Sequence, residues 1–296
     1  MNAIGSTPAF RNPFNTNRPS HPAPNSNSAS LNGAATASKY YLSYYYYHPW
    51  GFSSQGAHWA FMTKRHQLRY GSTEEQLGAV SVAFRKHASM NPNAIMKERF
   101  TIEDYMNSRM ISSPLCLFDC DIPIEGCTAV LLTTADRAKH LRQPPAYIAG
   151  YGQQAVKRPS LATYTVDDYM ACGGSTVSKI WDMSGLGPKD IGAAQLYDGF
   201  SPSTYYWLEA SGFCGEGEAW QFVQDGRIAL NGELPVNTFG GSLSEGRLHG
   251  MGHLAEAVRQ VTGRAGPRQI EGCEASIALD GSPMLRNAGI LFTREP

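Results

Sequence analysis

The chain has 296 residues, of which 42% are hydrophobic and 17% are charged, and its formal net charge is zero. This composition is that of a globular protein, long enough to bury a sizeable core in one large domain or two small ones. The balanced charge argues against nucleic-acid binding driven by bulk electrostatics, and no apolar run approaches the length that a membrane span needs.

Targeting signals and metal-binding patterns are both missing from the sequence. The first residues contain no hydrophobic core of the kind that a signal peptide needs. Six cysteines are scattered along the chain without a paired CxxC or a Cys/His zinc spacing. We therefore expect reduced thiols, no metal site and a cytoplasmic location.

The N-terminal stretch, residues 1–38, is rich in Asn, Ser, Pro, Ala and Thr and has almost no apolar periodicity. Such a segment cannot bury enough surface to offset its ordering entropy, so we expect a disordered or non-native extension. The segment KYYLSYYYYHPW follows at 39–50. Because basic residues are not interleaved with its tyrosines, a lipid- or protein-facing loop is favoured over nucleic-acid binding.

Helical patterns begin at about residue 55. The first predicted helix ends at Gly71, a residue suited to a C-cap. Thr73 is a good N-cap for the second helix, EEQLGAVSVAFRKHASM, and Gln76 completes the signature of a capping box. A short third helix is expected from Thr101 to Met106.

Three histidines, His66, His87 and His140, lie on charged helical segments, and we expect them to be solvated. The apolar run 128–133 predicts a buried strand, 135–141 a helix and 146–150 a further strand. Pro144 and Pro145 mark a predicted subdomain boundary.

Strands and helices alternate in the second half of the chain. Helices are expected after Val166-Asp167-Asp168, at 204–210 and at 253–261, and strands at 193–197, 275–279 and 289–293. Alternation of this kind predicts an α/β fold with ligand chemistry at the strand ends.

Two polar clusters are candidates for that chemistry. One is NTFGGSLSEGRLHGMGH, from Asn237 to His253, and the other is YDGF, from Tyr197 to Phe200. Glycines beside polar side chains, just before a helix, are what a site needs when backbone must approach a ligand closely. We expect the two clusters to meet in space.

The blocks QLYDGFS, NTFGGSLSEG…HGMGHLAEAVRQ, DCDIPIEGCTAVLLT and ALDGSP…AGILFT resemble the thiolase superfamily. More narrowly, they resemble the sterol-carrier-protein-type thiolases and the lipid-transfer-protein acyl-CoA aldolases of bacterial steroid degradation. The resemblance runs roughly from Trp50 to the end of the chain. It implies a thiolase-like layered α-β-α fold with a truncated N-terminal half and a complete C-terminal half. Residues 39–145 would be a remnant of the N-terminal domain with its loop excursion, and 146–296 the C-terminal domain.

The resemblance also places individual residues. Tyr197 stands where thiolases carry a first histidine, Arg247 stands where they carry a second, and their later cysteine falls near Ala278. The nucleophilic cysteine of the family has no counterpart, and no cysteine of this chain inherits its role. A tyrosine in the first block is typical of the aldolase branch, so the substitutions favour aldol chemistry over acyl transfer.

Chemistry suggests roles for these residues. Tyr197 and His249 are the acid/base candidates; a tyrosine, with an ordinary pKa of about 10, needs a nearby positive charge to act as a base, and Arg247 could supply it. The amides of Gly240 and Gly241 would polarise the thioester.

Further substrate-binding candidates are Asp198, Asn237, Gly250 and Gly281. For Asp198 the alternative is that it only caps a turn or supports Tyr197. His253 is expected to begin its helix as a packing or capping residue.

The resemblance implies a lyase that cleaves a β-hydroxy acyl-CoA, such as one with a steroid side chain, by a retro-aldol reaction. The alternatives are a diverged acetyl-CoA acyltransferase and an inactive subunit that binds acyl-CoA. No cofactor is expected, because the coenzyme A thioester is the substrate. The expected partners are a second copy in a homodimer and a small OB-fold/zinc-ribbon accessory protein, with no nucleic acid and no membrane span.

Overall fold

A mixed four-stranded sheet is the framework of the computed structural model, which describes residues 48–50, 52, 54–155 and 168–296. Its strands are β3 (Tyr147–Ala155), β4 (Ala193–Leu196), β5 (Ala275–Ser282) and β6 (Arg286–Thr293). In space they follow the order β3-β6-β5-β4. Strand β6 runs antiparallel to β3 and β5, whereas β4 runs parallel to β5.

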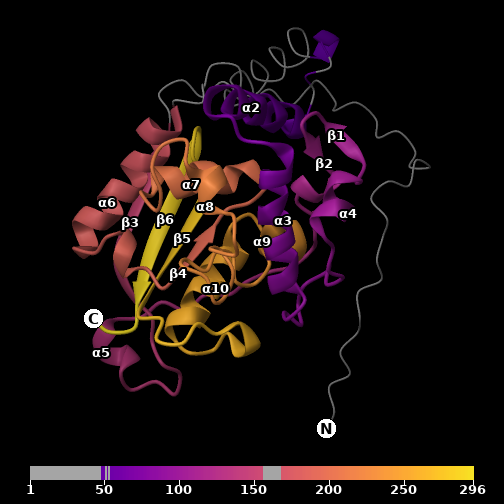
Figure 1. Ribbon diagram of the computed structural model, residues 1–296. Coiled ribbons are helices and arrows are strands. Elements are labelled where there is room, and N and C mark those ends of the chain that lie inside the picture. Colours follow the sequence, from indigo (N-terminus) through magenta and orange to yellow (C-terminus); the bar gives the residue numbers. More distant parts are fainter. Residues whose placement is uncertain (1–47, 51, 53, 156–167) are drawn as a thin grey trace, which may run out of the picture. The chain divides into compact units, whose positions relative to one another are not determined.

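Helices cover both faces of this sheet (Figure 1). Helix α6 (Ser175–Ser184) packs on β3 and β6. Helix α10 (Met251–Val261) packs on β4 and β5, where Ala257 and Val261 meet Ala278 and Phe292. Neighbouring strand residues turn to opposite faces, and Ile277 and Leu279 belong to the other core cluster. The layered α-β-α arrangement expected from the sequence is confirmed.

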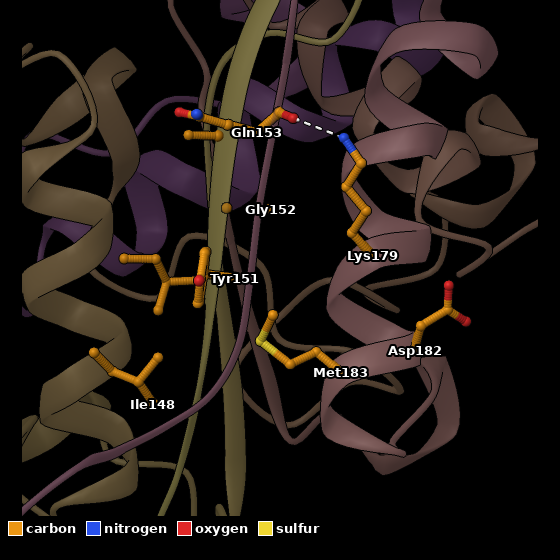
Figure 2. Close-up of a pocket in the computed structure, with 10 residues that line it drawn as sticks. Ile148, Tyr151, Gly152, Gln153, Lys179, Asp182 and Met183 are labelled. Carbon is orange, nitrogen blue, oxygen red and sulfur yellow. Dashed lines mark hydrogen bonds between the residues drawn. The ribbon is translucent and has the colours of Figure 1, made fainter.

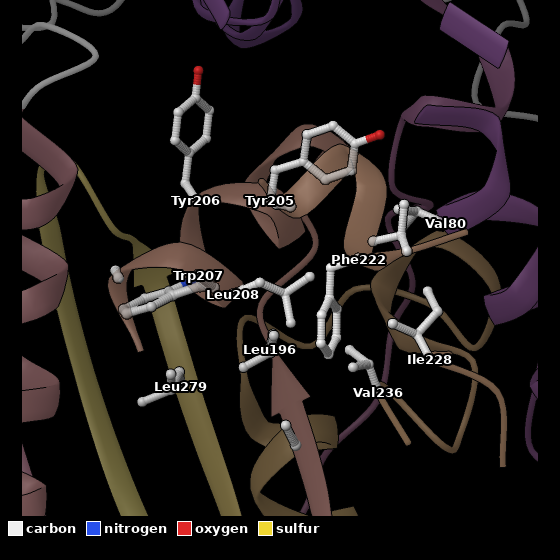
Figure 3. Packing of buried hydrophobic residues seen from close by; sticks show 14 of the residues in the cluster. Val80, Leu196, Tyr205, Tyr206, Trp207, Leu208, Phe222, Ile228, Val236 and Leu279 are labelled. Atoms are coloured by element: carbon white, nitrogen blue, oxygen red, sulfur yellow. The ribbon is translucent and has the colours of Figure 1, made fainter. Parts of the chain in front are cut away.

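The larger core cluster is centred on α7 (Pro202–Ala210), every residue of which is buried. Figure 3 shows Trp207 and Leu208 of this helix above Leu196 and Leu279 of the sheet, and all four side chains are fully buried. A helix that is buried all round cannot be recognised from an amphipathic pattern, because it has no solvated face. Its position directly after β4 fixes the loop that carries Tyr197.

Helices of the first half begin and end where their sequences predict. Helix α2 (Gln55–Tyr70) ends at Gly71, whose φ is 77° and whose N–H donates to the Gln67 carbonyl. Helix α3 (Glu74–Ala88) begins with a capping box between Thr73 and Gln76. Helix α4 (Ile102–Met106) begins with a second capping box, at Thr101.

The remaining elements are short. They are η2 (His48–Trp50), β1 (Met110–Ser112), β2 (Leu115–Cys116), η3 (Leu117–Asp119), α5 (Ala135–Ala138), η4 (Met170–Gly174), η5 (Pro188–Asp190), α8 (Ala219–Phe222), α9 (Gly241–Ser244) and η6 (Gly266–Arg268). Helix α5 covers only the first part of the helix predicted at 135–141.

The chain divides into Met1–Gly51 and Phe52–Pro296, and all elements after η2 belong to the second unit. The predicted extension at 1–38, most of the aromatic segment 39–50, and Val166-Asp167 lie outside the described residues. The domain boundary between 145 and 146 stays a prediction. No helix in the described part of the chain is long and apolar enough to cross a membrane.

The buried strand predicted at 128–133 is wrong. This segment is neither strand nor helix, and Leu131 and Leu132 are 85% and 73% exposed. A strand forms only where neighbouring strands accept its hydrogen bonds, and the described residues bring none beside it. An apolar run indicates residues that favour a strand, but it does not show whether other strands lie beside them.

Two of the three histidine predictions are also wrong. His66 and His87 are buried, with exposed fractions of 2% and 1%, whereas His140 is exposed as predicted. The His66 ring lies 3.3 Å from the Glu209 carboxylate, and the His87 ring lies 3.1 Å from the Asn237 carbonyl oxygen. Burial lowers the pKa of His87 to about 4, so this ring is neutral. Charged neighbours along a helix do not reveal which of its faces meets the core.

Candidate functional site

The two polar clusters of the sequence meet at the end of β4. Asp198 lies two residues after Leu196, the last residue of that strand, and its side chain is fully buried. Its carboxylate accepts hydrogen bonds from the backbone amides of Ser242, at 2.7 Å, and Leu243, at 3.2 Å. The carboxylate thus binds the N-terminal turn of α9 and fixes the glycine-rich stretch against the sheet.

His253 is the second partner of this carboxylate. Its Nε2 atom lies 2.9 Å from Asp198 Oδ1, and its ring is buried. The His253 ring also packs against the rings of Tyr197, at 5.7 Å between centroids, and Phe239, at 5.0 Å. His253 lies inside α10, which begins at Met251, and it connects this helix to the Tyr197 loop.

Two of the predicted binding glycines make room for carboxylates. Gly241 has a φ of 64°, and a Cβ atom there would overlap the carboxylate of Asp198. Gly250 has a φ of 84°, and a Cβ atom there would overlap the carboxylate of Asp280. Only glycine combines the left-handed backbone with the space that these acidic groups occupy.

The predicted binding residues Asn237 and Gly240 are occupied within the protein. Asn237 Oδ1 accepts from the Leu196 amide, and Asn237 Nδ2 donates to the Leu196 carbonyl, both at 2.7 Å. The Gly240 amide donates to the Asn237 carbonyl at 2.9 Å. Gly240 is therefore unavailable as the expected oxyanion donor, and of the two proposed amides only that of Gly241 makes no hydrogen bond within the described residues.

Asp121 is a site residue that sequence reasoning missed. Its backbone amide donates to the Gly199 carbonyl at 3.2 Å, and the next residue, Ile122, donates to the Ser242 carbonyl at 3.2 Å. Arg247 donates its amide to the Ile122 carbonyl at 2.8 Å and its guanidinium to both Asp121 carboxylate oxygens, at 3.1 and 3.2 Å. The block DCDIPIEG therefore pairs with the glycine-rich stretch. Nothing in the local sequence of either segment predicts that the two lie side by side.

Burial shapes the acidity of this carboxylate. It raises the pKa of Asp121 to about 6, even though the Arg247 guanidinium acts in the opposite direction and Asp198 adds a smaller upward effect. Asp121 therefore titrates close to neutrality. The arginine expected to activate Tyr197 forms an ion pair with this carboxylate.

Tyr197 is half-buried, and its environment keeps it protonated. Burial raises its pKa above the ordinary value of 10.0, and the carboxylates of Asp121 and Asp280 raise it further. Arg247 lowers it, but by less than these effects combined. Arg247 therefore acts on Tyr197 in the expected direction, but it does not bring the pKa of Tyr197 below its ordinary value. A tyrosine with this pKa is a hydrogen-bond and proton donor.

Asp280, near the end of β5, is the other missed carboxylate. Burial raises the pKa of Asp280, while the nearby His253 ring, a hydrogen bond from the Gly281 amide and the His249 ring act in the opposite direction. His249 is exposed and has a φ of 46°, so it stands at the rim of the cluster. Gly281, predicted to bind substrate, accepts a hydrogen bond from the Trp207 indole at 3.3 Å through its carbonyl. Asp280 precedes Gly281 directly, and it is the Asp280 carboxylate, not Gly281, that lies against Gly250.

The cysteines nearest to Asp121 are not poised as nucleophiles. Burial raises the pKa of Cys116 to about 11 and that of Cys120 to about 12. Both thiols keep their protons at neutral pH, and a thiol in that state is a poor nucleophile. Among the described residues, no group of three His, Cys, Asp or Glu side chains is placed to hold a metal ion.

An open groove of about 830 Å³ lies elsewhere, along β3, β6 and α6 (Figure 2). Ile148 and Tyr151 of β3 and Met183 of α6 contribute apolar side chains, and Lys179 donates to the Gln153 carbonyl at 3.1 Å. Strand β3 forms the opposite edge of the sheet from β4. The groove is therefore separate from the Tyr197 cluster, where the titratable groups converge.

Comparison with known proteins shows which family this chain is similar to. Residues 162–293 match the family model described as "Thiolase C-terminal domain-like". The chain is 42% identical over 224 residues to the 17-hydroxy-3-oxo-4-pregnene-20-carboxyl-CoA lyase of Mycobacterium tuberculosis, covering 73% of this chain and 57% of the relative. It is 40% identical over 222 residues to a steroid side-chain-cleaving aldolase of Thermomonospora curvata, covering 73% of this chain and 56% of the relative.

A solved structure shows the same likeness. The structure of an Ltp2-ChsH2(DUF35) aldolase superimposes with a TM-score of 0.77 at 32% identity, over 90% of this chain and 69% of that one. The chain thus spans little more than half the length of the two curated relatives and about two thirds of the solved one.

Proposed function

Because this chain belongs to the thiolase superfamily, we propose that it acts on an acyl-CoA thioester and cleaves a carbon–carbon bond by retro-aldol chemistry. The observation that carries the proposal is the protonated Tyr197 hydroxyl, set among Asp121, Asp280 and Arg247. A proton donor at this place suits an enolate, whereas acyl transfer needs a thiolate. The names of the two curated relatives support a steroid side chain as the acyl group.

The first step is removal of a proton from the β-hydroxyl group. His249 accepts this proton, because an exposed imidazole is the side chain whose ordinary pKa is nearest to neutrality. As the O–H bond breaks, a ketone forms at the β-carbon and the bond between the α- and β-carbons breaks. Its electron pair passes to the thioester oxygen, giving an enolate.

The second step returns a proton to carbon. The Arg247 guanidinium and the Gly241 amide stabilise the enolate oxygen, and Tyr197 donates its proton to the α-carbon. The phenolate then recovers a proton from the His249 imidazolium. The products are a ketone and a shorter acyl-CoA, and no oxidant or reductant is consumed.

Asp198 and His253 act on the site through other residues. Their buried pair holds α9 and the Tyr197 loop together, and the proposed chemistry assigns them no proton transfer. Asp280 lies near His249 and Tyr197, where its carboxylate favours the imidazolium that the first step creates.

The proposed assembly includes an accessory protein. The solved aldolase of the same fold is named with a DUF35 component, which supports a small partner of that class for this chain. A homodimer and a cytoplasmic location complete the proposal.

The proposal is tested with a β-hydroxy steroid acyl-CoA whose hydroxyl is on the β-carbon. The chain is incubated with it, with and without a DUF35-class protein, and ketone and shorter acyl-CoA are measured by mass spectrometry. We expect the two products in equal amounts. Exchange of acyl groups between thioesters without ketone would contradict cleavage and indicate an acyltransferase, and binding without turnover would indicate an inactive subunit.

A further inference from the structure

The ion pair between Arg247 and Asp121 engages only one end of the guanidinium. In the bidentate pairing that arginine favours, two of its nitrogens donate to the two oxygens of a carboxylate. Here Arg247 Nη1 alone makes both contacts, at 3.1 and 3.2 Å. Among the residues that the structure describes, Arg247 Nε and Nη2 have no hydrogen-bond acceptor, and the side chain is 24% exposed. The N–H groups on these two nitrogens therefore remain for a ligand.

Asp121 is the rigid partner of this pair. Isolated β-bridges hold the backbone on both sides of it: Cys120 pairs with Phe200, and Pro123 pairs with Arg247. The Asp121 side chain is only 7% exposed, so the carboxylate has little room to move. Arginine has a long side chain, and it loses rotamer freedom when it is held in one geometry. The guanidinium therefore takes its position from the carboxylate.

Gly199 brings this pair next to the Tyr197 hydroxyl. A Cβ atom at Gly199 would lie 3.3 Å from Tyr197 Oη and 3.4 Å from Asp121 Oδ2, so the hydroxyl and the carboxylate border the same face of this glycine. In the proposed reaction, Tyr197 donates its proton to the α-carbon of the substrate. The thioester oxygen is separated from that carbon only by the carbonyl carbon. A guanidinium held at Asp121 therefore lies close to the oxygen on which negative charge develops.

These contacts give the two partners different roles. We propose that Asp121 is a positioning residue: its carboxylate holds Arg247 Nη1, so that Nε or Nη2 donates to the thioester oxygen as the enolate forms. The inference rests on the retro-aldol reaction proposed above and adds a residue to it. The negative charge of Asp121 itself opposes the enolate. The benefit therefore comes from fixing the guanidinium, because a small displacement of a catalytic group is costly to the rate.

A double-mutant cycle tests whether Asp121 acts through Arg247. Asp121→Asn should lower kcat by about 10-fold with little change in KM, because the misplaced guanidinium acts only in the transition state. Arg247→Ala should lower kcat by about 100-fold or more, the range for loss of an oxyanion donor. The double variant should be about as slow as Arg247→Ala alone. An Asp121 with a purely structural role would instead multiply the two losses.

Chemical rescue gives a second measurement. In Arg247→Ala, free guanidinium ion can bind Asp121 in the space of the lost side chain, and we expect it to raise kcat by about 10-fold. The ion is added at a concentration too low to unfold the protein, at a pH well above the pKa of Asp121, about 6. Arg247→Ala combined with Asp121→Asn should not respond. The matched control combines Arg247→Ala with Glu233→Gln, which removes the carboxylate of a surface arginine pair, and should be rescued fully.

With a parent protein that cleaves its substrate, multiplied losses in the cycle, or a rescue that is absent or independent of Asp121, would overturn the proposal. Circular dichroism checks that each variant is folded. A parent protein without cleavage would contradict the proposed reaction instead. The positioning role is then decided by a crystal structure of Arg247→Ala soaked in guanidinium. An ion on the Asp121 carboxylate would support the role, and a carboxylate without the ion would overturn it.

Discussion

The imidazole of His253 lies 2.9 Å from the carboxylate of Asp198, and neither side chain is exposed by more than 2%. The same carboxylate accepts two backbone amides of α9. One buried acidic group therefore joins β4, α9 and α10, the three elements that surround Tyr197.

Replacing that group by its amide, Asp198→Asn, should cost about 2 to 4 kcal/mol of unfolding free energy, because one carboxylate oxygen becomes a donor that faces donors. Urea unfolding followed by circular dichroism measures the loss. Glu216→Gln is the control, since Glu216 pairs with Arg69 at the surface and should change stability by less than about 1 kcal/mol. Equal losses in the two variants would contradict the assignment.

The Asp198 carboxylate also restricts position 241 to glycine. Gly241→Ala adds a methyl group where Asp198 lies and forces a left-handed backbone, so we expect a loss of about 3 kcal/mol or more. Gly263→Ala has a similar φ, 69°, but open space around the added atom, and should cost only about 1 kcal/mol. Comparing the thermal unfolding midpoints of the two variants isolates the destabilisation that the clash with Asp198 causes. Indistinguishable midpoints would contradict this clash.

Asp121 should give stability a pH dependence of defined sign. Its pKa is raised from 3.8 to about 6 in the folded protein, so its protonated form is favoured by folding. The resulting contribution is fully present below about pH 4 and is lost as the pH rises through about 6, with a change on the order of 2 kcal/mol. Arg247, Asp198 and Tyr197 face this carboxylate and remain in the variant Asp121→Asn.

The measurement is therefore a difference between two titrations. Chemical unfolding of the parent and of Asp121→Asn at several pH values should show the parent losing stability relative to the variant between about pH 4 and 6. A stability difference between parent and variant that is independent of pH would contradict this prediction. So would a parent that gains stability relative to the variant as the pH rises, because burial would then not raise the pKa of Asp121.

Tyr197→Phe removes the proposed proton donor and keeps the ring that packs on His253. We expect cleavage to fall by about 100-fold or more, the range that general acid catalysis contributes, while the unfolding midpoint changes little. Product formation from the β-hydroxy acyl-CoA is the measurement. Tyr151→Phe, on the exposed edge strand β3, is the control and should retain full turnover. A Tyr197→Phe variant that forms product at the parent's rate would show that Tyr197 is not the proton donor.

His249→Ala tests the proposed proton acceptor. Turnover should fall by about 100-fold, the range that a general base contributes. Because His249 is exposed, the fold should be unaffected, as in the control His140→Ala. A His249→Ala variant with unchanged turnover would contradict this role, and Asp121→Asn would then be the next variant to assay.

Local signals in the sequence were sufficient for the elements that they directly encode. The predicted caps at Gly71 and Thr73 are confirmed, because a cap is decided by a few neighbouring residues. The segment 128–133 shows the limit of such reasoning. Its apolar run describes a strand, but whether a strand forms depends on what lies beside it.

The site was predicted in part for the same reason. Tyr197, Arg247 and His249 lie in conspicuous glycine-rich blocks, and the structure brings their surroundings together. Asp121 was missed because it belongs to a distant block, and its pairing with Arg247 exists only in three dimensions. Asn237 was predicted to bind substrate because it is polar, yet its side chain replaces strand pairing at the end of β4. Residue type alone does not tell an internal partner from an external one.

The alignment of Ile122 with Ser242 and Arg247 also has a consequence for the order of folding. These contacts close a long loop that contains β3 and β4 together with α6, α7 and α8. Closure of a long loop costs chain entropy before any contact offsets it. The site should therefore assemble late, after the sheet and its covering helices have brought the two segments within reach. Asp121 then docks as the last piece, and a chain interrupted in this step would have a native core around an unformed active centre.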